Sequence, residues 1–314
     1  MVSDLPPELA AGDDAGNARA YFVAAVALGL TPGIGVKTIS RLLEKFGSLE
    51  AILQADGKAL RQVEGVGPKI AAGVRRNDAT YCATLDRDLR QWASARDAIR
   101  ATTWLSVDYP PVWADLDDGP LVAFYRGAWL ESDWQTVAIV GTREASPRAL
   151  QRASQIAADF AAEAWTVASG LARGIDTAAH RGALDAGGRS LAVLGGGIAA
   201  DAIYPSENRT LAERIAARGA LFCEGYPLAQ PSAQGLTIRN RLISGLSRAV
   251  IVVEGSASSG AMHAARYARK QGRLLFTFAD GGSGCVQLLA DGALAFESAA
   301  KVIAAIRADG LTNQ

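Results

Sequence analysis

The chain has 314 residues, and its 32 basic and 32 acidic side chains give a formal net charge of zero. Its hydrophobic fraction of 49% suits a globular protein, and no apolar run reaches the roughly 18 residues of a membrane-spanning helix. The acidic N-terminus lacks the features of a signal peptide. Three cysteines in distant positions exclude a disulfide scaffold and favour a cytoplasmic location. They show no metal-ligand spacing, and we expect neither a metal nor a cofactor.

Two glycine turns organise the N-terminal part of the chain. Residues 1–17 are expected to form a disordered acidic tail. In the helical region 18–77, the turns 31–38 (TPGIGVKT) and 63–70 (VEGVGPKI) repeat after thirty-two residues. The pair resembles a tandem helix-hairpin-helix module of the SAM-like type, a small all-α domain. Each turn can present the N–H groups of the following helix to a phosphate, with Lys37 or Lys69 alongside. Whether these hairpins contact DNA or only pack together stays open.

A change of pattern marks a second, larger domain. Residues 78–134 form a bridging segment, with a helix over 79–101 and then extended segments and turns near 104, 109–113 and 120–126. From 135 to 314 short apolar runs alternate with helix-like segments, which predicts a Rossmann-like, doubly wound, mainly parallel α/β sheet. The expected strands are 136–141, 165–169, 190–195, 220–224, 249–254, 273–279 and 293–296. Helices are expected to begin near Pro147, Ile175, Glu207, Ile238, Gly260 and Ser298.

Such a sheet offers a crevice for anions at the carboxyl ends of its strands. Helix N-termini there present N–H groups and the positive end of a dipole. Residues 237–275 carry seven basic side chains and one acidic one, whereas residues 101–135 carry six acids and one arginine. This asymmetry favours a local anion-binding face rather than a basic surface over the whole chain.

Common nucleotide-binding motifs are absent from the crevice. The first turn, 141–146 (GTREAS), does not match the Gly-x-Gly-x-x-Gly fingerprint of dinucleotide-binding proteins. The chain also has no P-loop of the kind found in ATPases. Asp176 and His180 lie four residues apart on one helix. We expect them to be a buried orienting pair rather than an acid–base pair, so no catalytic residue is assigned.

Five ordered motifs carry a resemblance. They are 140–143 (VGTR), 169–176 (SGLARGID) with Ala179 and His180, 192–195 (AVLG) with 204–208 (YPSEN), 239–247 (RNRLISGLS), and 252–254 (VVE) with 259–260 (SG). Together they resemble the DprA/Smf family of DNA-processing proteins. The resemblance implies a non-catalytic homodimer that binds single-stranded DNA and loads the recombinase RecA onto it during natural transformation.

The same resemblance implies the residues of the DNA site. They are Gly141, Thr142, Arg143, Ser169, Gly170, Arg173, Gly174, Arg239, Asn240, Arg241, Ser259 and Gly260. The chain departs from the family where Thr142 replaces a serine, and where Ala261, Met262 and His263 follow Gly260 in place of Ser-Leu. The winged-helix C-terminal domain of many relatives is expected to be absent.

Three matters stay open at this point. An enzyme that cleaves nucleoside monophosphates, similar to a phosphoribohydrolase, could use the same crevice, although residues 254–260 (EGSASSG) lack the second glutamate of that motif. A protein adaptor with a vestigial crevice is the third class. Arg241 could bind a phosphate or could pair with Glu254 inside the domain.

Rings near the crevice are few, namely Tyr204, Tyr226 and Tyr267, which predicts sequence-tolerant binding through the DNA backbone.

Overall fold

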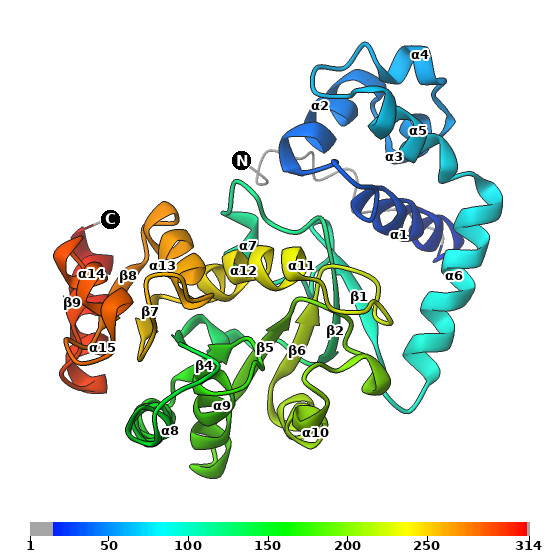
Figure 1. The fold of residues 1–314 in the computed structure, drawn as a ribbon. Helices are drawn as coiled ribbons and strands as arrows, with labels where there is room; N and C mark the ends of the chain where they lie inside the picture. Colours follow the sequence, from blue (N-terminus) through cyan, green and yellow to red (C-terminus); the bar gives the residue numbers. More distant parts are fainter. Residues whose placement is uncertain (1–14, 313–314) are drawn as a thin grey trace. The chain divides into compact units, whose positions relative to one another are not determined.

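The computed structural model describes residues 15–312 and divides the chain into two compact units, Met1–Phe124 and Tyr125–Gln314 (Figure 1). The boundary falls inside the segment 78–134 that the sequence sets apart as a bridge. The expected acidic tail lies outside the described residues except for its last three residues. These belong to helix α1 (Ala15–Gly29).

Unit 1 contains the helical hairpin module. After α1 come α2 (Val36–Phe46), α3 (Leu49–Gln54), α4 (Gly57–Leu60), α5 (Pro68–Arg76) and α6 (Ala79–Ser94). The two glycine turns precede α2 and α5, and each faces the helix that follows the other turn. A Cβ on Gly33 would lie 3.0 Å from Ile70, and one on Gly65 would lie 3.5 Å from Arg41. The repeated sequence therefore folds as two hairpins packed reciprocally, and the predicted all-α domain is confirmed.

The segment between α6 and the main sheet is more regular than its sequence suggested. It contains β1 (Arg100–Thr103), α7 (Pro111–Ala114), β2 (Val122–Gly127) and the 3₁₀ turn η2 (Glu131–Trp134). The stretch 109–113, expected as an extended segment or turn, contains the start of a short helix, because Pro111 at the first helical position starts α7, and Trp113 is fully buried. The helix expected to reach residue 101 stops at Ser94, and Arg100 already belongs to a strand.

Unit 2 is built on a parallel sheet. The strands are β3 (Thr136–Val140), β4 (Thr166–Ser169), β5 (Ser190–Leu194), β6 (Ala220–Cys223), β7 (Ala249–Val252), β8 (Leu274–Thr277) and β9 (Leu294–Ala295). Their order across the sheet is β6-β5-β4-β3-β7-β8-β9, and every neighbouring pair in this series is parallel. The strands from β3 to β7 are buried throughout, as both faces of the sheet are covered. The predicted doubly wound α/β fold is confirmed.

Helices connect these strands on both faces. In Figure 1, α8 (Pro147–Ala162), α9 (Ile175–Asp185) and α10 (Arg209–Arg218) lie on one side of the sheet. The other side carries α11 (Ala233–Ile238), α12 (Asn240–Gly245) and α13 (Ala261–Lys270). Helix α15 (Ala299–Thr312) packs on α8, and its buried Val302 joins the core cluster around Ile139 and Phe160. The sequence missed α14 (Ser283–Ala290), which fills the connection from β8 to β9.

The strand order creates one place where connections diverge. Strand β3 lies between β4 and β7, and the chain leaves β3 toward β4 but leaves β7 toward β8. Loops that depart in opposite directions leave a crevice at the carboxyl ends of the two strands. The segments after β3 and after β7 therefore form the two sides of the site described below.

The opposite end of the sheet is fixed by a buried carboxylate. Asp133 is fully buried and accepts hydrogen bonds from Arg189 Nε (2.9 Å) and Nη2 (2.8 Å), Thr166 Oγ1 (2.8 Å) and the Leu130 amide (2.8 Å). Thr166 begins β4, and Arg189 directly precedes β5. One side chain thus ties together the starts of neighbouring strands.

Removing this carboxylate should cost far more stability than removing an exposed one. We expect Asp133→Ala to lower the free energy of unfolding by about 3–5 kcal/mol, because it leaves Arg189 without its buried partner. The matched control is Asp185→Ala, whose ion pair with Arg214 is 64% and 45% exposed; its loss should stay below about 1 kcal/mol. Urea unfolding measures both, and equal losses would contradict an anchoring role for Asp133.

Candidate functional site

A cleft of about 460 Å³ opens at the carboxyl ends of β3 and β7. Its walls come from four segments: the turn after β3, the turn after β4, helix α11 with the start of α12, and the loop that leads into α13. The lining residues are Val140, Gly141, Thr142, Arg143, Glu144, Ala172, Asp176, Ala233, Leu236, Thr237, Arg239, Asn240, Ser256, Ser259, Gly260, Ala261 and His263. The cleft is therefore formed at the topological switch point that the strand order predicts.

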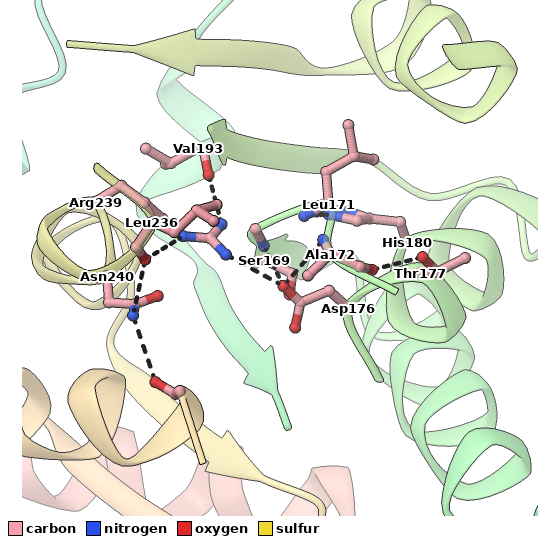
Figure 2. Close-up of polar contacts among 12 residues, drawn as sticks. Ser169, Leu171, Ala172, Asp176, Thr177, His180, Val193, Leu236, Arg239 and Asn240 are labelled. Atoms are coloured by element: carbon pink, nitrogen blue, oxygen red, sulfur yellow. Dashed lines mark hydrogen bonds and ion pairs between the residues drawn. The ribbon is translucent and has the colours of Figure 1, made fainter. Parts of the chain in front are cut away.

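A buried ion pair forms its floor. Arg239 and Asp176 are 7% and 4% exposed, and Arg239 Nη2 lies 3.6 Å from Asp176 Oδ2 (Figure 2). Arg239 Nη1 also donates to the carbonyl of Val193 at 2.6 Å. Asp176 accepts from the amides of Gly170 (3.1 Å) and Ala172 (3.3 Å). Burial raises the pKa of Asp176, and the Arg239 guanidinium and the amide donors partly offset this effect.

The guanidinium of Arg239 lies directly on the turn after β4. A Cβ added to Gly170 would come within 1.4 Å of Arg239 Nη1, so a larger residue there would have to displace the buried guanidinium. Gly174, which precedes α9, has φ of 74°, and a Cβ there would lie 2.3 Å from the carbonyl oxygen of Thr142. These two glycines allow the turn to sit between the turn after β3 and Arg239.

A second buried network holds the same turn. Leu171 adopts φ of 59°, a left-handed conformation that is strained for a leucine. Its amide donates to His180 Nε2 at 3.3 Å, and its carbonyl accepts from Asn208 Nδ2 at 3.0 Å. Because Nε2 accepts, the proton of the neutral ring is on Nδ1, which donates to Ser190 Oγ at 2.7 Å. Ser190 in turn donates to the Val167 carbonyl at 2.9 Å.

Asp176 and His180 are thus buried residues that orient the turn, as expected, but they act on different atoms. Asp176 holds the amides on either side of Leu171, whereas His180 holds the amide of Leu171 itself (Figure 2). Burial, with a smaller contribution from the charge of Arg239, lowers the pKa of His180 to about 3. The imidazole therefore stays neutral at physiological pH.

The N-terminus of α8 is occupied by a side chain of the protein. Glu254, at the end of β7, accepts from the Ser146 amide at 2.8 Å and from Ser146 Oγ at 2.8 Å. Its backbone carbonyl accepts from the Thr142 amide at 2.8 Å. The helix dipole after β3 is already matched by this carboxylate. An anion in the cleft must therefore find its donors elsewhere.

The charges that line the cleft balance one another. Arg143 and Arg239 are countered by Glu144 and Asp176. The charge of Arg239 is neutralised by Asp176 in the buried pair, whereas Arg143 is exposed and has no ion-pair partner among residues 15–312. The cationic character of this crevice thus depends on Arg143, which stands at its mouth.

The site residues expected from the sequence fall into four groups, of which the paired arginines are described separately below. Those that line the cleft are Gly141, Thr142, Arg143, Arg239, Asn240, Ser259 and Gly260. Gly170 and Gly174 lie in the turn after β4, outside the lining, and Ser169, the last residue of β4, donates through Oγ to the Ile139 carbonyl at 2.7 Å. Lys37 and Lys69 are exposed in the hairpins of unit 1.

Two of the expected arginines are paired outside the cleft lining. Arg173 is exposed and forms an ion pair with Glu207. Arg241 is 7% exposed and pairs with Glu224. The alternative of an Arg241–Glu254 pair was wrong in its partner, because Glu254 is bonded to Ser146, the N-cap of α8. Arg241 is nevertheless held inside the domain.

Several lining residues had no place in the expected site. Ala233, Leu236 and Thr237 form one wall on α11, and Glu144, Ser256 and His263 complete the rim. The α11 residues precede the helix start expected near Ile238, so they were read as loop. His263 gave a signal in the sequence, since it stands where the chain departs from the family pattern.

Residues 15–312 contain neither a candidate membrane-spanning helix nor a candidate metal site. No helix there is long and apolar enough to cross a membrane. The described histidine, cysteine and acidic side chains form no group of three or more that could hold a metal ion.

The fold and the cleft together define a Rossmann-like protein with a polar crevice at its switch point. Comparison with known sequences assigns it to a family. The family model described as DNA recombination-mediator protein A matches residues 100–307, and that of the SAM-like helix-hairpin-helix tandem matches residues 28–75. Protein Smf of Synechocystis sp. is 33% identical over 96% of this chain and 75% of its own length. The chain belongs to the DNA recombination-mediator protein A family, known as DprA/Smf.

Solved structures agree with this assignment. The X-ray structure of DNA processing protein A from Streptococcus pneumoniae matches 90% of this chain and 95% of its own, with a TM-score of 0.73 and 28% identity. DNA processing protein A from Helicobacter pylori, whose structure addresses its binding of single-stranded DNA, matches 66% of this chain and 94% of its own, with a TM-score of 0.56 and 27% identity.

The neutral state of His180 predicts a pH dependence of stability. Its folded pKa of about 3 lies below the unfolded value near 6.5, so the unfolded chain binds an extra proton as pH falls between these values. The free energy of unfolding should drop by up to about 1.4 kcal/mol per pH unit below 6.5 from this group alone. Urea midpoints between pH 7 and pH 4 measure this slope, which His180→Gln should flatten.

The control for this measurement is Asn208→Ala. It removes the other tie to Leu171 without removing a titrating group, so it should lower stability while leaving the slope unchanged. An unchanged slope in His180→Gln would show that another group causes the acid sensitivity.

Proposed function

We propose that the chain is a DNA-processing recombination mediator that binds single-stranded DNA in the cleft at the ends of β3 and β7. Membership of the DprA/Smf family supports the class of ligand. The observation that carries the location is Arg143, an exposed arginine without an ion-pair partner among the described residues, at the mouth of a polar cleft. A planar guanidinium is suited to a phosphate because it donates two parallel hydrogen bonds.

Further donors lie across the cleft from Arg143. The amides of Gly260 and Ala261 begin α13 and have no backbone acceptor among the described residues. A Cβ built on Gly260 would meet no atom within 4 Å, so the approach to this turn is open. We propose that Arg143 and these amides hold one backbone phosphate between them, with Thr142, Asn240 and Ser259 as further polar contacts.

The ion pair of Arg239 and Asp176 has a supporting part in this proposal. It fixes Gly170 and the turn after β4, and with them the floor on which the strand lies. Contacts of the strand with Ser169, Gly170, Arg173, Gly174 and Arg241 stay predictions. The ion pair of Arg241 with Glu224 favours a structural role for this arginine.

The remaining functional expectations rest on the family. We propose that the protein delivers bound single strands to RecA, acts as a homodimer in the cytoplasm and performs no catalysis. The proposed division of labour places DNA binding in the Rossmann-like domain, 135–314, joined through the segment 78–134 to the hairpin module, 18–77.

Replacing Arg143 should weaken DNA binding without unfolding the chain. We expect Arg143→Ala to lower the affinity for an oligo-dT strand about tenfold or more, because hydrogen bonds to charged groups contribute ~1.5–3 kcal/mol. The slope of log K against log salt should shrink by roughly one. Fluorescence anisotropy at several salt concentrations measures both quantities.

The matched control is Arg181→Ala, which removes an exposed arginine of α9 outside the cleft. Its affinity and salt slope should stay within error of the original protein. An Arg143→Ala protein that binds normally, or two variants that weaken binding equally, would remove the cleft from the proposal.

The hairpins allow a separate test. If Lys37 and Lys69 contact DNA, the double variant Lys37→Ala, Lys69→Ala should lose affinity for strands long enough to reach unit 1 and should bind short strands normally. Each lost phosphate contact should reduce the salt slope by about one for long strands only. Unchanged binding of both short and long strands would indicate that the hairpins serve packing or protein binding rather than DNA binding.

A further inference from the structure

We propose that His263 is a base-binding residue: its ring forms the surface on which one unpaired nucleobase stacks inside the cleft. The inference rests on the proposed binding of single-stranded DNA and extends it from the phosphate to the base. It assigns to His263 a contact that depends on the ring and not on its charge.

The first observation is the composition of the cleft wall. Among the described residues that line the cleft, His263 provides the only aromatic ring. Proteins that bind single strands without sequence preference combine cationic groups with flat side chains on which bases stack. Tyr204 and Tyr226, which the sequence placed near the crevice, lie outside its lining, as does Tyr267. His263 is therefore the lining residue whose ring can serve as a stacking surface within the cleft.

The second observation is that the ring of His263 is available. The residue is half-buried in the first turn of α13, and its amide donates to the Gly260 carbonyl at 3.2 Å. The imidazole itself has no hydrogen bond or ion pair among residues 15–312. This contrasts with His180, whose ring nitrogens are both used inside the protein. The two histidines of the chain thus have opposite surroundings.

The third observation is the arrangement of the walls. Ala233, Leu236 and Thr237 form a largely apolar wall on α11, and Arg143 stands at the mouth. The side chain of Asn240 donates to the carbonyls of Leu236 (3.4 Å) and Gly260 (3.5 Å), so it connects the α11 wall to the turn that leads to His263. The cleft between these walls has a volume of about 460 Å³. A base that stacks on the His263 ring has to leave the stack of a duplex, which gives a physical reason for preferring single strands.

The test compares two variants on two oligonucleotides. His263→Ala removes the ring, and His263→Phe keeps a ring without a titrating nitrogen. The probes are an oligo-dT strand and a strand of equal length whose nucleotides are abasic, with the same phosphates. Fluorescence anisotropy gives the affinities, and thermal unfolding confirms that each variant is folded.

We expect His263→Ala to bind oligo-dT about fivefold or more weakly, as loss of one stacked base predicts, and to bind the abasic strand as the original protein does. His263→Phe should bind both strands as the original protein does. Two results would overturn the inference: a His263→Ala loss that is equal on both strands, or a His263→Phe protein that behaves like His263→Ala. The first result would indicate a contact to the backbone, and the second would indicate a charged or hydrogen-bonded contact in place of stacking.

Arg143→Ala separates this inference from the function on which it rests. It should weaken binding to both strands, because it removes a phosphate contact. If Arg143→Ala behaves in this way and His263→Ala shows no difference between strands, only the base-binding surface is wrong. If the original protein binds neither strand, the proposed function is wrong, and the inference fails with it.

Discussion

The cleft depends on one buried ion pair, in which Arg239 of the segment after α11 reaches Asp176 of α9 across the turn after β4. The arginine lies so close to Gly170 that a larger residue there would have to displace it, and the carboxylate holds the amides on both sides of Leu171. Removing two charges from water is costly, so the pair persists only because each partner makes further hydrogen bonds. Its effect is to hold the β4–β5 and β6–β7 connections together as one floor.

The charged residues of the site are of two kinds: those paired inside the protein, and Arg143, which is available to a ligand. Arg239 is neutralised by Asp176, and the N-terminus of α8 is matched by Glu254. Arg173 and Arg241 are paired with glutamates. Arg143 has no such partner among the described residues, and it stands where the loops after β3 and β7 diverge. The arginines of the sequence motifs therefore have different roles, although the sequence alone does not distinguish them.

The sequence predicted the fold because its signals are local: apolar runs mark the strands, and glycines mark the turns that follow them. The resemblance to the DprA/Smf family pointed to much of the cleft lining, including Gly141, Arg143, Arg239 and Gly260, which stand at strand ends or helix starts. The sequence could not predict which arginines are paired, because Glu207 and Glu224 meet Arg173 and Arg241 only after folding. The α11 wall was missed for a related reason: residues 233–237 become a wall only because the chain crosses back from β6 to β7.

Amide hydrogen exchange with and without a saturating oligo-dT strand tests the central claim, that the single strand lies in the cleft between the segments after β3 and β7. The account predicts slower exchange in peptides covering 141–146 and 256–263 when the strand is bound, and no change in α10 on the outer face of the sheet. Protection confined to unit 1 or to α10, with the cleft segments unchanged, would contradict it.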